Sequence, residues 1–129
     1  MKDVQKAVIK KDDKFLILLR SKTADFFPDY WDFPGGKLEP NEIPEEGIER
    51  EVKEETTLTI KAKEVVGVYE YDLTNCGHND FRFTVYNIEI LEGKVKIGFE
   101  HQEFKWATKE EVLNLRIEPF LIEYFKEHP

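Results

Sequence analysis

Three glutamates near the middle of the chain, Glu51, Glu54 and Glu55, have a spacing that could bring their carboxylates together. Glu54 and Glu55 follow Glu51 by three and four residues, so on an α-helix all three share one face, with Cβ atoms roughly 5–6 Å apart. At an effective dielectric constant of ~20, each pair of charges at that spacing repels by about 3 kcal/mol, against less than about 1 kcal/mol in bulk water. The spacing therefore leaves two interpretations open: a solvated, charged helix face, or a cleft that holds a cation.

A Gly35-Gly36 pair upstream of these glutamates favours the cation site. Glycine backbone can approach a ligand closely and offer carbonyl oxygens. Mg²⁺ prefers oxygen ligands, commonly one or two carboxylates together with substrate phosphates and water. Arg50 keeps its charge and could hold a neighbouring carboxylate in place. These residues predict a site for Mg²⁺, with Mn²⁺ as an alternative, on a helix that follows a glycine turn.

The hydropathy pattern predicts an α+β domain with a mixed sheet flanked by helices. A helix is expected over residues 42–56, with Pro44 at its first position and Ile48 and Val52 facing the core. A capping box at Thr108 predicts a short helix, and a last helix is expected over residues 118–126. A loop is expected over residues 21–30, and strands over residues 4–10 (half-buried), 15–19, 58–60, 65–73, 81–91, 95–99 and 104–106.

Length and composition restrict the class of protein. The 129 residues amount to one domain, residues 1–129, and carry a net charge of −8. An acidic surface repels nucleic acid, and no apolar run approaches the ~20 residues of a membrane span. The single cysteine, Cys76, excludes an internal disulfide and suits a reducing compartment. We therefore expect a cytoplasmic protein that acts on a small molecule, with no nucleic-acid or membrane partner, and the question of a homodimer stays open.

The segment from residue 36 to residue 58 resembles the Nudix box, Gly-x5-Glu-x7-Arg-Glu-apolar-x-Glu-Glu-x-Gly-apolar. Eight of the nine specified positions match, and residues 31–39 resemble the run that leads into the box in MutT-like members. The exception is Thr57, where the family has glycine. Glycine would supply a left-handed residue at the end of the helix, so we expect a different helix end or backbone strain at Thr57.

The resemblance implies a Nudix-type fold, with a mixed sheet between helices and a loop–helix–loop motif. It also implies Mg²⁺-dependent hydrolysis of a diphosphate bond in a nucleoside diphosphate linked to another group, and a (d)NTP cleaved to the monophosphate and pyrophosphate is the favoured substrate. Glu51, Glu54 and Glu55 would bind the metal together with a carbonyl of Gly35 or Gly36, while Arg50 orients a carboxylate. Glu42 either pairs within the motif or is a solvated acid of the first turn.

Several residues outside the box are candidates for the same site. Family members often add an acid from a later loop as metal ligand or base, and Glu103 is our choice, with a solvated loop glutamate as the alternative. His101 is a second candidate for the base, against the commoner role of a surface histidine. The position from which purine-specific relatives read the base corresponds to Ile117, which disfavours oxidised guanine as a substrate. Candidate substrate-binding residues are Arg20, Lys22, Phe33, Lys37, His78 and Phe83.

Three other functions compete with nucleotide hydrolysis by this site. The first is a Nudix-fold domain that binds or senses nucleotides without cleaving them, and the complete set of acids argues against it. The second is a pyrophosphatase for ADP-ribose or a dinucleotide. The third is an acidic interaction domain whose glutamate-rich helix faces solvent.

Overall fold

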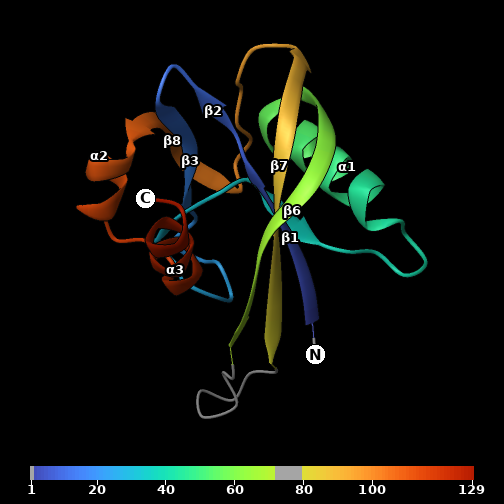
Figure 1. Ribbon diagram of the computed structural model, residues 1–129, viewed down its shortest axis with the longest axis horizontal. Helices are drawn as coiled ribbons and strands as arrows, with labels where there is room; N and C mark the ends of the chain where they lie inside the picture. The colour runs from blue at the N-terminus through green and yellow to red at the C-terminus, as the bar shows by residue number, and fades with distance from the viewer. Residues whose placement is uncertain (1, 72–79) are drawn as a thin grey trace.

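The computed structural model describes residues 2–71 and 80–129, which form two neighbouring β-sheets with helices on both sides (Figure 1). The first sheet has the strand order β5-β1-β7-β6. It is mixed, because β1 runs parallel to β7 while the β1–β5 and β6–β7 pairs are antiparallel. Its strands are β1 (Lys2–Val8), β5 (Gly35–Lys37), β6 (Thr59–Tyr71) and β7 (Phe81–Glu92).

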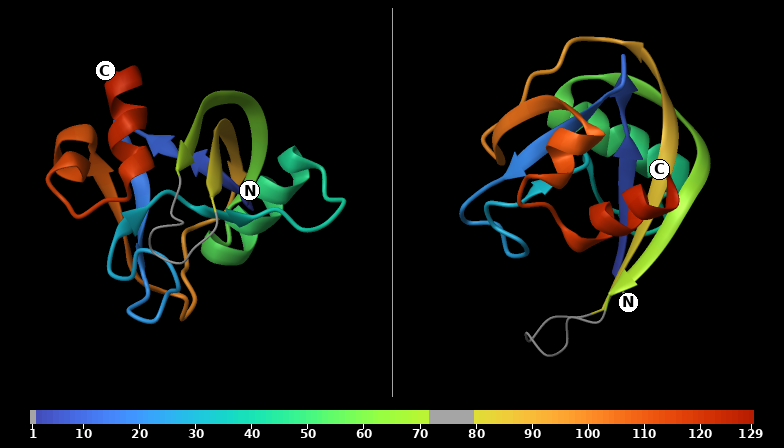
Figure 2. Two further views of the ribbon diagram at one scale, coloured as in Figure 1. Left: turned by 90° about the horizontal axis from the view of Figure 1, so that it is seen from below. Right: turned by 60° about the vertical axis from the view of Figure 1, so that its left-hand side comes forward.

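The second sheet is built around β3, which pairs antiparallel with all three of its neighbours. Helix α1 lies on one side of the molecule, and α2 and α3 lie on the other (Figures 1 and 2). The predicted α+β class, with a mixed sheet between helices, is therefore confirmed. The remaining elements are β2 (Lys10–Lys11), β3 (Lys14–Arg20), β4 (Trp31–Asp32), β8 (His101–Thr108), α1 (Pro44–Thr56), α2 (Lys109–Leu113) and α3 (Pro119–Glu127).

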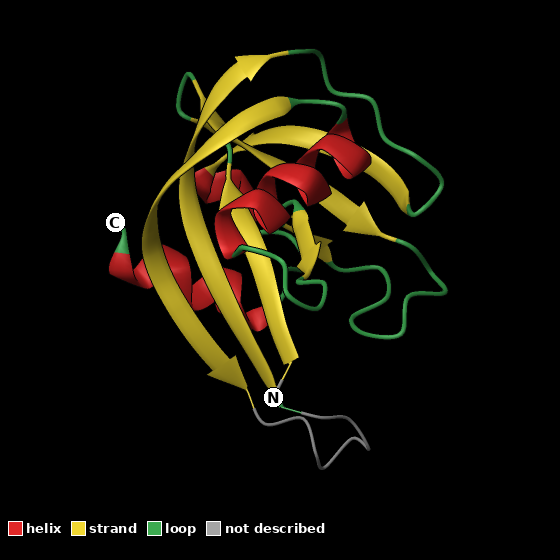
Figure 3. Cartoon of the chain, turned by 90° about the vertical axis from the view of Figure 1, so that its right-hand side faces the viewer, coloured by secondary structure: helices red, strands yellow, loops and turns green. Residues whose placement is uncertain are grey.

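Two hydrophobic clusters hold these layers together. Ile48 and Val52 of α1 are fully buried, as predicted, and pack in a cluster with residues of β1 and β3. Phe120 and Leu121 of α3 are equally buried in a second cluster that also contains residues of β1, β3, β6 and β7. Each such side chain stabilises the fold by about 1.5–3 kcal/mol. Helix α1, which carries the glutamates, is thus fixed to the sheet along its apolar stripe. Figure 3 shows the helix lying across the strands.

Strand β1 is buried more completely than its alternating pattern predicts. It lies between β5 and β7, and its apolar residues belong to both clusters. Even Gln5 and Lys6 are only 3% exposed. The expectation of a half-buried strand was wrong, because the strand has core on both faces. A lysine in such a strand needs a buried partner, which places an ion pair in the interior.

Helix α1 begins at Pro44, which takes the first helical position as predicted although the expected range began at residue 42. The helix ends at Thr56, and its C-cap Thr57 adopts the left-handed conformation with φ of 66°. The Thr57 N–H donates to the carbonyl of Lys53 at 3.0 Å, and the Thr57 hydroxyl donates to the carbonyl of Lys94. Gly93 comes so close that a Cβ atom on it would lie 3.0 Å from the Thr57 carbonyl oxygen. The expected strain is thus present at Thr57, and contacts to residues 93–94 help to hold Thr57 in this conformation.

Three further predicted strands differ from the structure. Residues 95–99 form no strand: Val95 and Ile97 pack against the α1 cluster in irregular chain, and the Lys96 N–H donates to the Thr56 carbonyl. The strands expected over residues 58–60 and 65–73 are one strand, β6, with register shifts that mark bulges; residues 72–73 lie outside the described residues. The capping box at Thr108 is confirmed. None of the helices in the described part of the chain has the length and apolar character that crossing a membrane would need.

Candidate active site

A cavity of about 360 Å³ lies between the glycine strand β5, the glutamate face of α1 and the ends of both sheets. Its walls combine carboxylates, cations, glycine backbone and aromatic rings. It is lined by Val4, Lys6, Arg20, Phe26, Phe27, Gly35, Gly36, Lys37, Glu51, Glu54, Glu55, Phe81, Phe83, Glu100 and Glu118. The three glutamates of α1 and the two glycines, singled out by their spacing alone, therefore face the same space.

The glycines allow two carboxylates of α1 to contact the backbone of β5. The Gly35 N–H donates to Glu55 Oε1 at 2.7 Å. A Cβ atom on Gly36 would lie 2.5 Å from the carboxylate of Glu51, so glycine lets that side chain keep its present position. Glu55 is 11% exposed and Glu51 18%, whereas Glu54 lies at the rim and is 58% exposed.

Arg50 joins the carboxylates of the motif. Its Nε and Nη2 donate to the two oxygens of Glu42 at 2.7 and 2.9 Å, a bidentate pair. Its Nη1 donates to Glu51 at 3.0 Å and to Glu54 at 3.1 Å. Glu42 also accepts from the Glu39 N–H, and the bond from Arg50 lowers the pKa of Glu42 to about 2. Glu42 therefore pairs within the motif and is not a free acid of the first turn.

The buried carboxylates of α1 are held in an unfavourable electrostatic environment. Burial raises the pKa of Glu55 to about 8, and the Lys6 ammonium and the Gly35 N–H offset this only in part. Burial also raises the pKa of Glu51, against the opposing effect of Arg50. Each shift measures the free energy of keeping a negative charge in this cavity. A divalent cation beside these groups would remove that penalty.

The donor set suits a hard divalent cation, although the side chains are not yet arranged around one. In residues 2–71 and 80–129, no three His, Cys, Asp or Glu side chains are already placed to hold a metal ion. The reason is visible in the hydrogen bonds: Arg50 holds Glu51 and Glu54, and the Gly35 N–H holds one oxygen of Glu55. Rotation of the exposed Glu54 away from Arg50 would free oxygens of the kind that Mg²⁺ prefers.

A network of buried charges forms the floor of the cavity. Lys6 Nζ donates to Asp32 Oδ2, and Arg20 lies 3.6 Å from the same oxygen and 4.0 Å from Glu118 Oε2. Burial and the nearby Asp32 raise the pKa of Glu118 well above its usual value. Asp32 Oδ1 and Glu118 Oε2 are buried without another hydrogen-bond partner among the described residues, and a protonated Glu118 carboxyl can donate to Asp32. Of these two acids, Glu118 lines the cavity, so the floor offers a ligand the Glu118 carboxyl.

This floor corrects one inference from the sequence. Ile117 is indeed unable to form hydrogen bonds and is buried in the α3 cluster, but the next residue, Glu118, is the N-cap of α3 and lines the cavity. The start of the last helix thus does offer a polar group to a ligand. The sequence signal for a buried acid at this floor was Lys6, because a lysine in an apolar strand requires an acidic partner.

Of the six proposed substrate-binding residues, three line the cavity, two do not, and one lies outside the described residues. Arg20, Lys37 and Phe83 line the cavity. Lys22 does not, because it is exposed and pairs with Asp29 at 3.2 Å. The choice of Phe33 was wrong: it is 1% exposed and packs among rings of the α3 cluster such as Phe120. His78 lies outside the described residues.

Among the described residues that line the cavity, Glu100 takes the place expected for Glu103. Glu103 is exposed on β8 opposite Leu19. A register shift after Leu19 pairs Arg20 with His101, and His101 Nε2 then lies 3.6 Å from Glu55 Oε2. Burial and the positive charge of Lys6 lower the pKa of His101 to about 4, so this ring is neutral at pH 7.

Comparison with known proteins agrees with the geometry. The NUDIX domain family matches residues 3–127. The chain belongs to the Nudix family. The chain is similar to the ADP-ribose pyrophosphatase of Methanocaldococcus jannaschii. The identity is 35% over 97 residues, which are 74% of this chain and 55% of that protein. The chain is also similar to the CTP pyrophosphohydrolase of Escherichia coli (strain K12), with 27% identity over 119 residues, 92% of this chain and 84% of that protein.

Solved structures place the chain among MutT-like members of the family. The MutT protein from Methanosarcina mazei Go1 superimposes with a TM-score of 0.85 and 28% identity, over 98% of this chain and 94% of that one. Nudix hydrolases generally use divalent metal ions, in accord with the donor set on α1. The protein is therefore a Nudix hydrolase of the MutT-like type, an enzyme of the pyrophosphohydrolase family.

Proposed function

We propose that this Nudix hydrolase cleaves the diphosphate bond of a nucleoside diphosphate linked to another group, with Mg²⁺, or Mn²⁺ in its place, as cofactor. A (d)NTP converted to the monophosphate and pyrophosphate is the first substrate to consider. One observation carries the proposal: the three carboxylates of α1, the glycines of β5, the cation Lys37 and a set of aromatic rings line one cavity. That combination suits a ligand with a planar base at one end and a metal-bridged diphosphate at the other.

Each part of the cavity has a role in this proposal. Glu51, Glu54 and Glu55 hold the metal, with a carbonyl of Gly35 or Gly36. When bound, Mg²⁺ neutralises charge on the diphosphate and lowers the pKa of water. Arg50 keeps the carboxylates of α1 oriented through its bonds to Glu42, Glu51 and Glu54. Arg50 is thus a positioning residue, held in turn by Glu42.

The remaining groups bind the substrate and accept a proton. Lys37 offers its ammonium to a phosphate, since it lines the cavity beside the glycines. We assign the role of base to Glu100, not to Glu103, because Glu100 lies on the cavity wall and can hold the proton that the attacking water loses. Phe26 and Phe27, both half-buried, present ring surface on which a nucleobase can stack.

Hydrolysis with and without the metal tests the proposal. A panel of nucleoside triphosphates, ADP-ribose and dinucleoside polyphosphates is incubated with the protein, with Mg²⁺ or with EDTA, and phosphate, pyrophosphate and nucleotide products are measured. We expect at least one compound to be cleaved at its diphosphate bond with Mg²⁺ and the rate to fall to background with EDTA. Binding of a nucleotide without cleavage would instead identify the non-catalytic alternative. Neither binding nor cleavage, with stability unchanged by Mg²⁺, would favour the interaction domain.

A further inference from the structure

A second cavity of about 320 Å³ adjoins the first at the carboxylate cluster. The two cavities share Arg20, Glu55 and Glu100 as lining residues. The second is otherwise formed by the loop after β3 and the segment before β8, which lie side by side in Figure 2 (left). Gln102, near the start of β8, donates to the Arg20 carbonyl and to Asp29 of that loop. Glu55 of α1 therefore lies between two spaces, beside the other two glutamates of the helix.

The walls of the second cavity do not suit another phosphate group. Of the described residues that line it, Arg20 is the one cation, and its guanidinium already donates to the Phe26 carbonyl at 2.9 Å and lies 3.6 Å from Asp32. Glu55 and Glu100 are acids. The first cavity differs, because it contains Lys37 beside the glycines.

The same walls do suit an uncharged group that carries hydroxyls. Ser21 and Thr23 line the cavity, and their hydroxyls, 2.9 Å apart, each keep further hydrogen-bonding capacity. Phe99 also lines it and is 97% exposed, so its ring offers an apolar face on which the C–H side of a sugar can rest. A volume of about 320 Å³ is enough for a monosaccharide.

We propose that the second cavity holds the group on the far side of the scissile diphosphate, and that this group is an uncharged, hydroxylated one such as a sugar. The inference rests on the proposed function, because it takes the carboxylates of α1 as the place of cleavage. It makes a nucleoside diphosphate sugar a better substrate than the triphosphate of the same base, and it makes Phe99 a residue that determines specificity.

Matched pairs of substrates and one substitution test this assignment. ATP is compared with ADP-glucose, UTP with UDP-glucose and GTP with GDP-mannose, so that each pair shares a base. We expect the wild-type protein to have the higher kcat/KM for the sugar compound of the preferred base. Replacing Phe99 with alanine should lower kcat/KM for that compound about ten-fold, mainly through KM, as expected for the loss of one apolar contact surface. Hydrolysis of the triphosphate should stay within about two-fold.

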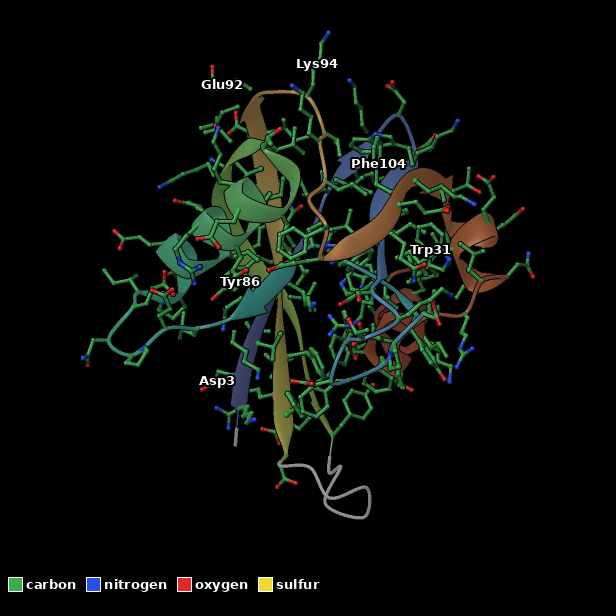
Figure 4. The ribbon with its side chains drawn as sticks, turned by 180° about the vertical axis from the view of Figure 1, so that it is seen from behind. Asp3, Trp31, Tyr86, Glu92, Lys94 and Phe104 are labelled. Carbon is green, nitrogen blue, oxygen red and sulfur yellow. The ribbon has the colours of Figure 1, made fainter. Side chains whose placement is uncertain are left out.

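The control is Phe104→Ala, which removes an exposed ring of β8. Phe104 is 40% exposed and lines neither cavity. Figure 4 shows Phe104 on the side of the molecule where Lys94 lies. It should leave both substrates unaffected. A preference for triphosphates, an equal loss for both substrates in Phe99→Ala, or no loss for either would overturn the assignment of the second cavity alone. Absence of hydrolysis for every compound would instead contradict the proposed function.

Discussion

Replacing Glu54 with glutamine should lower kcat about a thousand-fold while leaving the fold intact. Glu54 is 58% exposed at the rim of the cavity, so the substitution buries no new group and removes only the charge, while the amide oxygen can still accept from Arg50. A metal ligand that stabilises charge in the transition state contributes several kcal/mol, and a thousand-fold corresponds to about 4 kcal/mol. The rate is measured as release of pyrophosphate or monophosphate from the best substrate of the panel at saturating Mg²⁺.

The matched control for this change is Glu46→Gln on the same helix. Glu46 is exposed in the first turn of α1 and does not line the cavity, so its loss alters the charge of α1 equally but costs only a few tenths of a kcal/mol in stability. We expect Glu46→Gln to retain wild-type kcat. Undiminished turnover in Glu54→Gln, or an equal loss in Glu46→Gln, would contradict the assignment of Glu54 to the metal.

The second large effect concerns Glu55 and pH. Burial raises the pKa of Glu55 to about 8 from an ordinary value of 4.5, so the folded state binds its proton more tightly than the unfolded state. Its contribution to stability is therefore complete below about pH 4.5 and is lost as the pH rises toward 8. In metal-free buffer, the free energy of unfolding of the wild type should fall, relative to Glu55→Gln, by up to about 4 kcal/mol between pH 4.5 and pH 8.

Glutamine is the informative replacement because its amide oxygen can still accept the bond from the Gly35 N–H. Urea denaturation in EDTA at several pH values measures the free energy of unfolding of the wild type and of Glu55→Gln. The lowered pKa of His101 has the opposite effect on stability, and most of this effect cancels in the difference between the two proteins. A difference that does not change with pH would show that Glu55 is not held in an unfavourable environment. Adding Mg²⁺ at pH 8 should restore stability to the wild type and not to Glu55→Gln.

The catalytic helix could be predicted from the sequence because its determinants are local. Pro44 sets the start, Ile48 and Val52 set the buried face, and the spacing of the three glutamates then fixes which face they occupy. The missing glycine at position 57 predicted either a different helix end or backbone strain, and the structure has the strain. What the sequence did not reveal is that Thr57 would take the left-handed conformation itself, supported by the carbonyl of Lys94, a contact between residues far apart in the chain.

The rest of the site depends on tertiary structure that no local pattern records. Lys6, Asp32 and Glu118 come from three separate elements and meet only when the sheets and α3 are assembled. Phe33 packs among the rings of the α3 cluster, whereas its neighbour Asp32 pairs with Lys6, so the prediction that Phe33 binds substrate was wrong. The register shift between β3 and β8 brings His101 opposite Arg20, an irregularity that the sequence does not signal.

The most direct test of the account is metal binding by the glutamates of α1 in the absence of any nucleotide. Mn²⁺ is titrated into the wild-type protein and into the Glu54→Gln/Glu55→Gln double variant, and free Mn²⁺ is followed by electron paramagnetic resonance, with Mg²⁺ added as competitor. We predict that the wild type removes Mn²⁺ from solution, that Mg²⁺ releases it, and that the double variant loses most of this binding. Equal binding by both proteins, or none by the wild type, would contradict the claim that these carboxylates form the metal site.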